Sequence, residues 1–90
     1  MKEFIKDPDA VLDYKQDWTA WMPEGDFITA SSWVTDSDDL VVDSDSFTDT
    51  DATVWLSGGV AKRKYRVTNS IVTDDGREDD RSFLIICAEQ

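Results

Sequence analysis

The sequence predicts an all-β protein, an immunoglobulin- or fibronectin-III-like β-sandwich of about six or seven strands. The composition supports this, because Val, Ile and Thr number 21 and the aromatic residues 10, whereas Ala, Leu, Glu and Met total only 16. The patterning agrees, because five segments alternate with period two and have turn signals between them. These segments are residues 12–18, 28–34, 53–57, 65–72 and 83–88.

Each segment is expected to bury one row of its alternating side chains. Turn residues separate the rows: Pro23-Glu24-Gly25-Asp26, then Ser57-Gly58-Gly59, and finally Asp74-Asp75-Gly76-Arg77, in which Asp-Gly favours a hairpin. Residues 35–53 are less regular and contain one short strand at Leu40–Val42 within an acidic loop. The predicted core consists of Leu12, Tyr14, Ile28, Val54, Leu56, Tyr65, Val67, Ile71, Phe83 and Ile85.

Ninety residues allow one domain, which we divide into an N-terminal arm at 1–10 and a single sandwich at 11–90. Between Leu56 and Val67 a strand ends, turns through Gly58-Gly59 and re-enters with Tyr65-Arg66-Val67. This arrangement resembles the corner of immunoglobulin-like domains in which a tyrosine hydrogen-bonds back to the turn.

The charge balance excludes several classes of partner. Nine Lys and Arg stand against 20 Asp and Glu, for a net charge of −11. Nucleic acid and anionic membranes both require a basic surface, so neither is an expected partner. No apolar run is long enough for a membrane span and the N-terminus lacks a signal peptide, so we expect synthesis in a reducing cytoplasm.

Catalytic and metal-binding patterns are also weak. The chain has no His and a single Cys87, which removes the usual general base, a disulfide and a cysteine zinc site. The Asp-rich segment 43–51 suggests calcium, but an EF-hand would need Gly where Thr48 stands and Glu where Val54 stands. We therefore expect a non-enzymatic protein without a catalytic site, metal or cofactor.

Four tryptophans in so short a chain admit two interpretations. They can fill a thin core, or they can stack on sugars at the surface, which would indicate a glycan- or host-binding module. Trp33 and Trp55 lie out of phase with the apolar rows beside them, so these two are the predicted surface anchors.

The last strand predicts a contact surface. If Phe83, Ile85 and Cys87 face the core, Leu84 and Ile86 point outward, and a strand that is apolar on both sides needs a cover or a partner. Residues 16–61 contain no Lys or Arg, and a basic cluster follows directly, which would orient the contact. The candidate interface residues are Leu84, Ile86, Val72, Lys62, Arg63, Lys64, Arg66, Phe4 and Ile5.

The chain resembles the small virion proteins known as tailed-bacteriophage fiber-tail adaptor proteins. The resemblance begins at residues 6–14, continues through Asp17-Trp18 and Ser31-Ser32-Trp33, and closes with Gly76-Arg77, Asp80-Arg81-Ser82-Phe83 and Ile85. It is clearest in Ala52-Thr53-Val54-Trp55-Leu56-Ser57-Gly58-Gly59 and Tyr65-Arg66-Val67-Thr68-Asn69. Two departures stand out: Lys62 replaces a second glycine after the corner, and Leu84 and Ile86 occupy positions that are often polar.

The resemblance implies a non-enzymatic structural protein with an immunoglobulin-like fold. Its expected role is to join neck or tail proteins to fibres, as multiple copies in a symmetric assembly of the virion. A capsid decoration or head-tail connector-associated protein is the first alternative, and a glycan- or host-binding module is the second. The expected partners are other virion proteins of the tail, neck, fibre or capsid.

Overall fold

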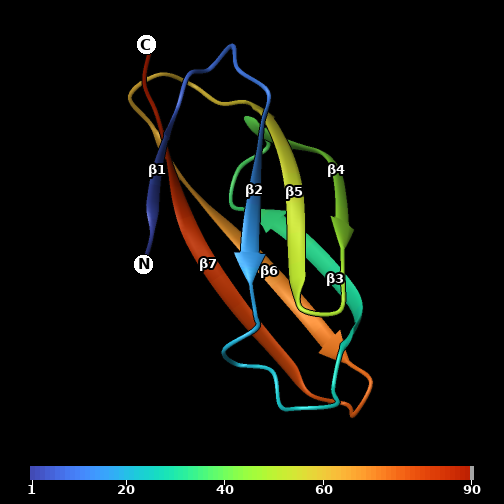
Figure 1. Cartoon of the computed structure of the whole chain (residues 1–90). Helices are drawn as coiled ribbons and strands as arrows, with labels where there is room; N and C mark the ends of the chain where they lie inside the picture. The colour runs from blue at the N-terminus through green and yellow to red at the C-terminus, as the bar shows by residue number, and fades with distance from the viewer. Residues whose placement is uncertain (90) are drawn as a thin grey trace.

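Seven strands form two facing sheets in the computed structural model, which describes residues 1–89 (Figure 1). The four-stranded sheet has the order β1-β7-β6-β3, and the three-stranded sheet has the order β2-β5-β4. The predicted all-β sandwich is therefore confirmed. The strands are β1 (Glu3–Lys6), β2 (Leu12–Asp17), β3 (Ile28–Thr35), β4 (Leu40–Phe47), β5 (Asp51–Gly58), β6 (Lys64–Thr73) and β7 (Glu78–Cys87).

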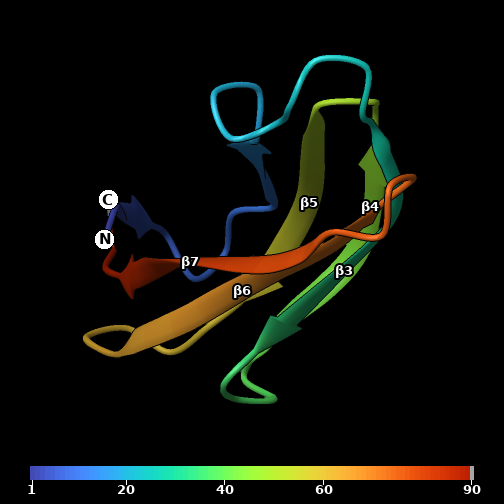
Figure 2. The same cartoon turned by 90° about the horizontal axis from the view of Figure 1, so that it is seen from below.

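The strand order is that of an immunoglobulin domain. The hairpins β4–β5 and β6–β7 each stay within one sheet, whereas every other connection between consecutive strands crosses from one sheet to the other. All the pairings are antiparallel except one, because β1 runs parallel to β7 with Ile5 opposite Ile86. Part of the expected N-terminal arm is thus a strand at the edge of the larger sheet. Figure 2 shows the two sheets meeting at β3 and β4 and diverging toward β1 and β2.

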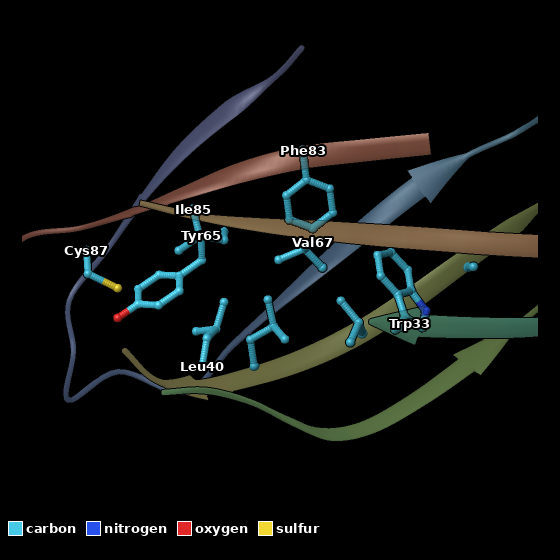
Figure 3. Packing of buried hydrophobic residues seen from close by; sticks show 10 residues of the cluster. Trp33, Leu40, Tyr65, Val67, Phe83, Ile85 and Cys87 are labelled. Atoms are coloured by element: carbon cyan, nitrogen blue, oxygen red, sulfur yellow. The ribbon is translucent and has the colours of Figure 1, made fainter. Parts of the chain in front are cut away.

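The core follows the alternation of β5, β6 and β7. Val54, Val67 and Ile85 have no exposed surface, and their neighbours along each strand point outward or to the sides. Figure 3 shows this row, from Cys87 and Tyr65 at one end to Trp33 at the other. A second, smaller cluster of Trp18, Ile28 and Ile71 lies beyond Trp33, near the start of β3 and the end of β6.

Two of the predicted core residues lie nearer the surface. Leu12 is 40 % exposed, so its assignment to the core was wrong. Although it pairs with buried Leu56, it starts the edge strand β2, where the facing sheet diverges. Tyr14, two residues further on, is half-buried and packs against the main cluster.

Trp33 was predicted to be exposed, but only 9 % of its surface is accessible, and its ring packs edge-on against Phe83 at 5.9 Å. The reason is a register shift in β3 between Ile28 and Ala30. An extra residue at a bulge reverses which side chains face the core, so Trp33 turns inward and Val34 is exposed. Trp55 is exposed as predicted, on the outside of β5.

The corner between β5 and β6 has the predicted tyrosine. The hydroxyl of Tyr65 accepts a hydrogen bond of 2.9 Å from the backbone N–H of Val60, five residues upstream. Gly59 has a φ of +95°, and a side chain there would collide with Sγ of Cys87, so the corner requires glycine.

The acidic segment that was expected to be a loop is an ordered hairpin. Strand β4 extends to Phe47 rather than ending at Val42, and a three-residue turn connects it to β5. Backbone hydrogen bonds hold this turn, because Trp18 N–H donates to Thr50 and Ile28 N–H donates to Asp49, at 2.8 and 3.0 Å. The predicted Asp-Gly hairpin between β6 and β7 is also present.

Candidate protein-binding faces

The outer face, meaning the side of the β1-β7-β6-β3 sheet turned away from the core, carries an apolar stripe. Leu84 and Ile86 point outward from β7 and are half-buried. The parallel pairing places Ile5 of β1 directly opposite Ile86, and Ile5 is 58 % exposed. Strand β1 therefore flanks and extends this stripe rather than covering it.

Basic side chains lie on the other side of the stripe. Lys64 pairs with Ile86 and Arg66 pairs with Leu84 across the β6–β7 ladder, so both cations share the outward row. Lys62 and Arg63 lie in the preceding turn, and Cys87 holds that turn by accepting a hydrogen bond of 2.7 Å from Lys62 N–H. Arg63 approaches Asp39 at 4.0 Å, while the other three form no ion pair within residues 1–89.

Two predicted interface residues lie elsewhere. Val72 pairs with Glu78 at the far end of β6, six residues from Arg66, which is about 20 Å along a strand. It therefore does not extend the stripe. Phe4 points inward, and its ring contacts those of Tyr14 and Phe83 at 5.1 and 5.4 Å.

The end of the outer face that lies away from Leu84 and Ile86 is acidic and slightly hollowed. Glu78 and Asp80 point outward from β7, opposite Val72 and Ser70. Together with Ala30 and its neighbours on β3 they line a hollow of about 270 Å³. The outer face thus has an apolar, basic end and a polar, acidic end, so a partner would bind it in one orientation.

A second surface feature was missed by sequence reasoning. At the open side of the sandwich, between β1, β7 and β2, lies a cavity of about 370 Å³, here called the edge pocket. Phe4 and Phe83 contribute its apolar wall, and three cations lie around it. The pocket is lined by Met1, Lys2, Phe4, Lys15, Gln16, Arg81, Ser82 and Phe83.

Two potentially reactive side chains, Cys87 and Lys6, are enclosed in the protein. Cys87 is fully buried, and this burial raises the pKa of its thiol. Lys6 beside it is also buried and donates to the backbone oxygens of Gly58 and Asp7 at 2.8 and 3.0 Å. Within residues 1–89 no three or more Asp, Glu, Cys or His side chains are grouped to hold a metal ion. That part of the chain contains no helix that could span a membrane.

These observations define a class: a small immunoglobulin-like sandwich whose distinctive features are two charged, partly apolar surfaces. Residues 6–86 match a family described as "Podophage GP4 fiber-tail adaptor protein gp77". The chain belongs to this family of phage fiber-tail adaptor proteins, as its resemblance implied. A search of curated proteins finds no match.

Family membership indicates the general function of the protein. The chain is a structural protein of a phage, its place is in the virion tail, and its partners are other tail or fibre proteins. A structural adaptor family also points to a protein that is not an enzyme.

Proposed function

We propose that this protein joins tail or neck components to fibres by binding a neighbouring virion protein through the basic end of its outer face. Multiple copies in a symmetric assembly would each present this surface. The observation that carries the proposal is the coincidence of Ile5, Leu84 and Ile86 with Lys64 and Arg66 on one exposed sheet face.

Leaving apolar side chains exposed beside a sheet edge has a cost for an isolated domain. An exposed apolar stripe next to the sheet edge favours aggregation of an isolated domain, and burial against a partner removes that risk. Each large aliphatic side chain that is buried there contributes about 1.5–3 kcal/mol before association entropy is subtracted. The adjacent cations favour an acidic partner surface, and they set its orientation more than its affinity.

The glycan-binding alternative has less support. It depended on Trp33 and Trp55 as a pair of surface anchors, and Trp33 is in the core. Trp55 is thus the remaining member of that pair with an exposed ring.

The test is incorporation of a double variant, Leu84→Asp with Ile86→Asp, into virions from a complemented deletion strain. Because both side chains point away from the core, the free variant is expected to remain folded by circular dichroism but to be absent from purified particles by mass spectrometry. Val41→Asp, an exposed position on β4 in the other sheet, is the matched control and should be incorporated normally. Normal copy number of the folded double variant would refute the proposed interface.

A further inference from the structure

The edge pocket combines an apolar wall with a positively charged surrounding. Its wall contains Phe4 and Phe83, whose rings are in contact, and its volume suits one large side chain with its flanking backbone. Around it lie Lys2, Lys15 and Arg81, three of only nine cationic side chains in a chain of net charge −11. This concentration of positive charge against the overall balance indicates an acidic ligand.

The three cations are largely free to bind one. Lys2 and Arg81 form no ion pair with a carboxylate within residues 1–89, and Lys15 has one pair, with half-buried Asp51 at 3.8 Å. Hydrogen bonds from Thr19 lower the pKa of Asp17, at the end of β2. The charges of Lys15 and Lys2 also contribute to lowering this pKa. The Arg81 guanidinium stacks 4.5 Å from the ring centre of Trp18. Stacking occupies the face of a guanidinium, whereas its N–H donors project from the edge.

The chain itself carries a segment with the complementary chemistry. Phe47, at the end of β4, is 43 % exposed and belongs to neither core cluster. Asp45 and Asp49 flank it two residues away on either side, and both are exposed. The acidic hairpin (residues 45–49) therefore presents one aromatic ring between two carboxylates.

This hairpin is held in a fixed shape before any contact forms. The backbone N–H of Thr48 donates to the backbone carbonyl of Asp51 at 2.9 Å. The Thr48 hydroxyl accepts hydrogen bonds from the backbone N–H groups of Thr50 and Asp51 at 3.3 and 3.2 Å. A preorganised segment loses little conformational entropy on binding, which favours its use as a docking element.

The hairpin and the pocket lie at opposite edges of the smaller sheet, separated by β5, because Phe47 and pocket-lining Gln16 pair with Ala52 from its two sides. In the order β2-β5-β4, strand β4 forms one edge of the sheet, and β2, which supplies Lys15 and Gln16 to the pocket, forms the other. Figure 1 shows β2 and β4 on the two sides of β5. A chain therefore does not insert its own hairpin into its own pocket.

We propose that the edge pocket of one copy receives the acidic hairpin of a second copy, with Phe47 against Phe4 and Phe83 and with the two aspartates facing the three cations. The contact joins different surfaces on the two copies, so it repeats from copy to copy and closes a ring when the rotation permits. It rests on the proposed assembly of multiple copies, but it uses none of the residues of the apolar stripe.

The first test is self-association of the purified protein, measured by sedimentation and by a concentration series of amide NMR spectra at low salt. We expect shifts that grow with concentration at both Lys15–Gln16 and residues 45–49, and that diminish as added salt screens the charges. Phe47→Ser should weaken association roughly tenfold or more, as loss of a central aromatic anchor does. Trp55→Ser removes an equally exposed aromatic side chain on the same sheet and should change it little.

The second test exchanges the charges. Lys2→Glu with Lys15→Glu, and separately Asp45→Lys with Asp49→Lys, should each abolish self-association. The two variants mixed together, or all four substitutions in one chain, should restore it.

Three results would overturn this proposal. One is the absence of association at millimolar protein. Another is failure of the exchanged charges to restore a contact that each half abolished. The third is a set of concentration-dependent shifts confined to Leu84 and Ile86, which would place the contact between copies on the outer face. Incorporation of the Leu84→Asp, Ile86→Asp variant tests the proposed function separately, because that variant retains both the pocket and the hairpin.

Discussion

The indole Nε1 of Trp18 donates a hydrogen bond of 2.9 Å to Oδ1 of Asn69, and both side chains are fully buried. Asn69 uses its Nδ2 atom to donate to the Ser31 hydroxyl and to the Ser32 carbonyl, each at 3.0 Å. One amide thus links the segment after β2 to the central strand β6 and the edge strand β3. The smaller core cluster depends on this link, because Trp18 is its largest member.

Asn69→Ala is expected to destabilise the fold by about 2–4 kcal/mol, because it leaves the Trp18 N–H and the Ser32 carbonyl without their buried partner. Chemical denaturation measures the change. In a double-mutant cycle with Trp18→Phe, the two losses should be less than additive, since each variant breaks the same bond. Strict additivity would show that the two side chains do not depend on each other.

Tyr65→Phe should lower the free energy of unfolding by about 1–3 kcal/mol, because Val60 N–H then has no acceptor at the corner. For a domain of this size the melting temperature falls by roughly 5–15 °C. Tyr14→Phe is the matched control, since the Tyr14 hydroxyl has no hydrogen-bond partner within residues 1–89, and it should be nearly neutral. Equal effects of the two variants would mean that the corner bond contributes nothing specific.

Gly59→Ala and Gly76→Ala should differ greatly, although both glycines have a φ near +90°. At Gly76 an added Cβ meets nothing within 4 Å, so the cost is the backbone strain of about 1–2 kcal/mol. At Gly59 the same atom collides with Sγ of Cys87, which adds a steric cost. Thermal unfolding should show the larger loss for Gly59→Ala, partly recovered when Cys87→Ala is added. No recovery in the double variant would point to backbone strain alone.

Asp26 should make stability depend on pH in the acid range. Burial alone would raise the pKa of this carboxyl, but a hydrogen bond from Thr73, backbone N–H groups of Asp75 and Phe27, and Arg77 at 3.1 Å together hold it below the ordinary value of 3.8. A depressed pKa in the folded state gives stability that is fully present above pH 3.8 and is lost as the pH falls through the folded value.

Asp26→Asn is therefore expected to lower the melting temperature by several degrees at neutral pH. The difference from the unmodified protein should shrink steadily as the pH falls below 3.8. A series of thermal melts between neutral and strongly acid pH measures it. A difference that stays constant over the whole range would show that the charge on Asp26 plays no part.

The sequence predicts correctly which side chains are buried wherever apolar and polar residues alternate along a strand without interruption. Val54, Val67 and Ile85 lie in central strands whose own burial alternates without a break around them, so period two alone identifies them as core. Trp33 was misplaced because a bulge reverses the phase of β3, and a bulge arises from pairing with β6 rather than from the local sequence. Leu12 was misplaced because alternation does not distinguish an edge strand from a central one.

The outer face was partly accessible to sequence reasoning, and the edge pocket was not. Leu84 and Ile86 are neighbours on one strand, so their shared direction follows from the period. Lys2, Lys15 and Arg81 come from three different strands or their ends, which meet only because the first strand joins the last in parallel. Such parallel pairing between the ends of a chain leaves no local pattern.

The parallel pairing of β1 with β7 also determines how the domain bears tension. When the two ends of the chain are pulled apart, the β1–β7 hydrogen bonds, among them Leu84 N–H to Lys2 and Ala88 N–H to Lys6 at 2.9 and 3.0 Å, lie across the direction of force. They are then sheared together instead of being opened one after another, as an antiparallel hairpin would be. Force spectroscopy should therefore find a high rupture force between the ends and a lower one after Phe4→Pro, because the backbone N–H of Phe4 lies on the same side of β1 as the Lys2 and Lys6 carbonyls that bond to β7. This strand pair would then act as a mechanical clamp between the two ends of the chain.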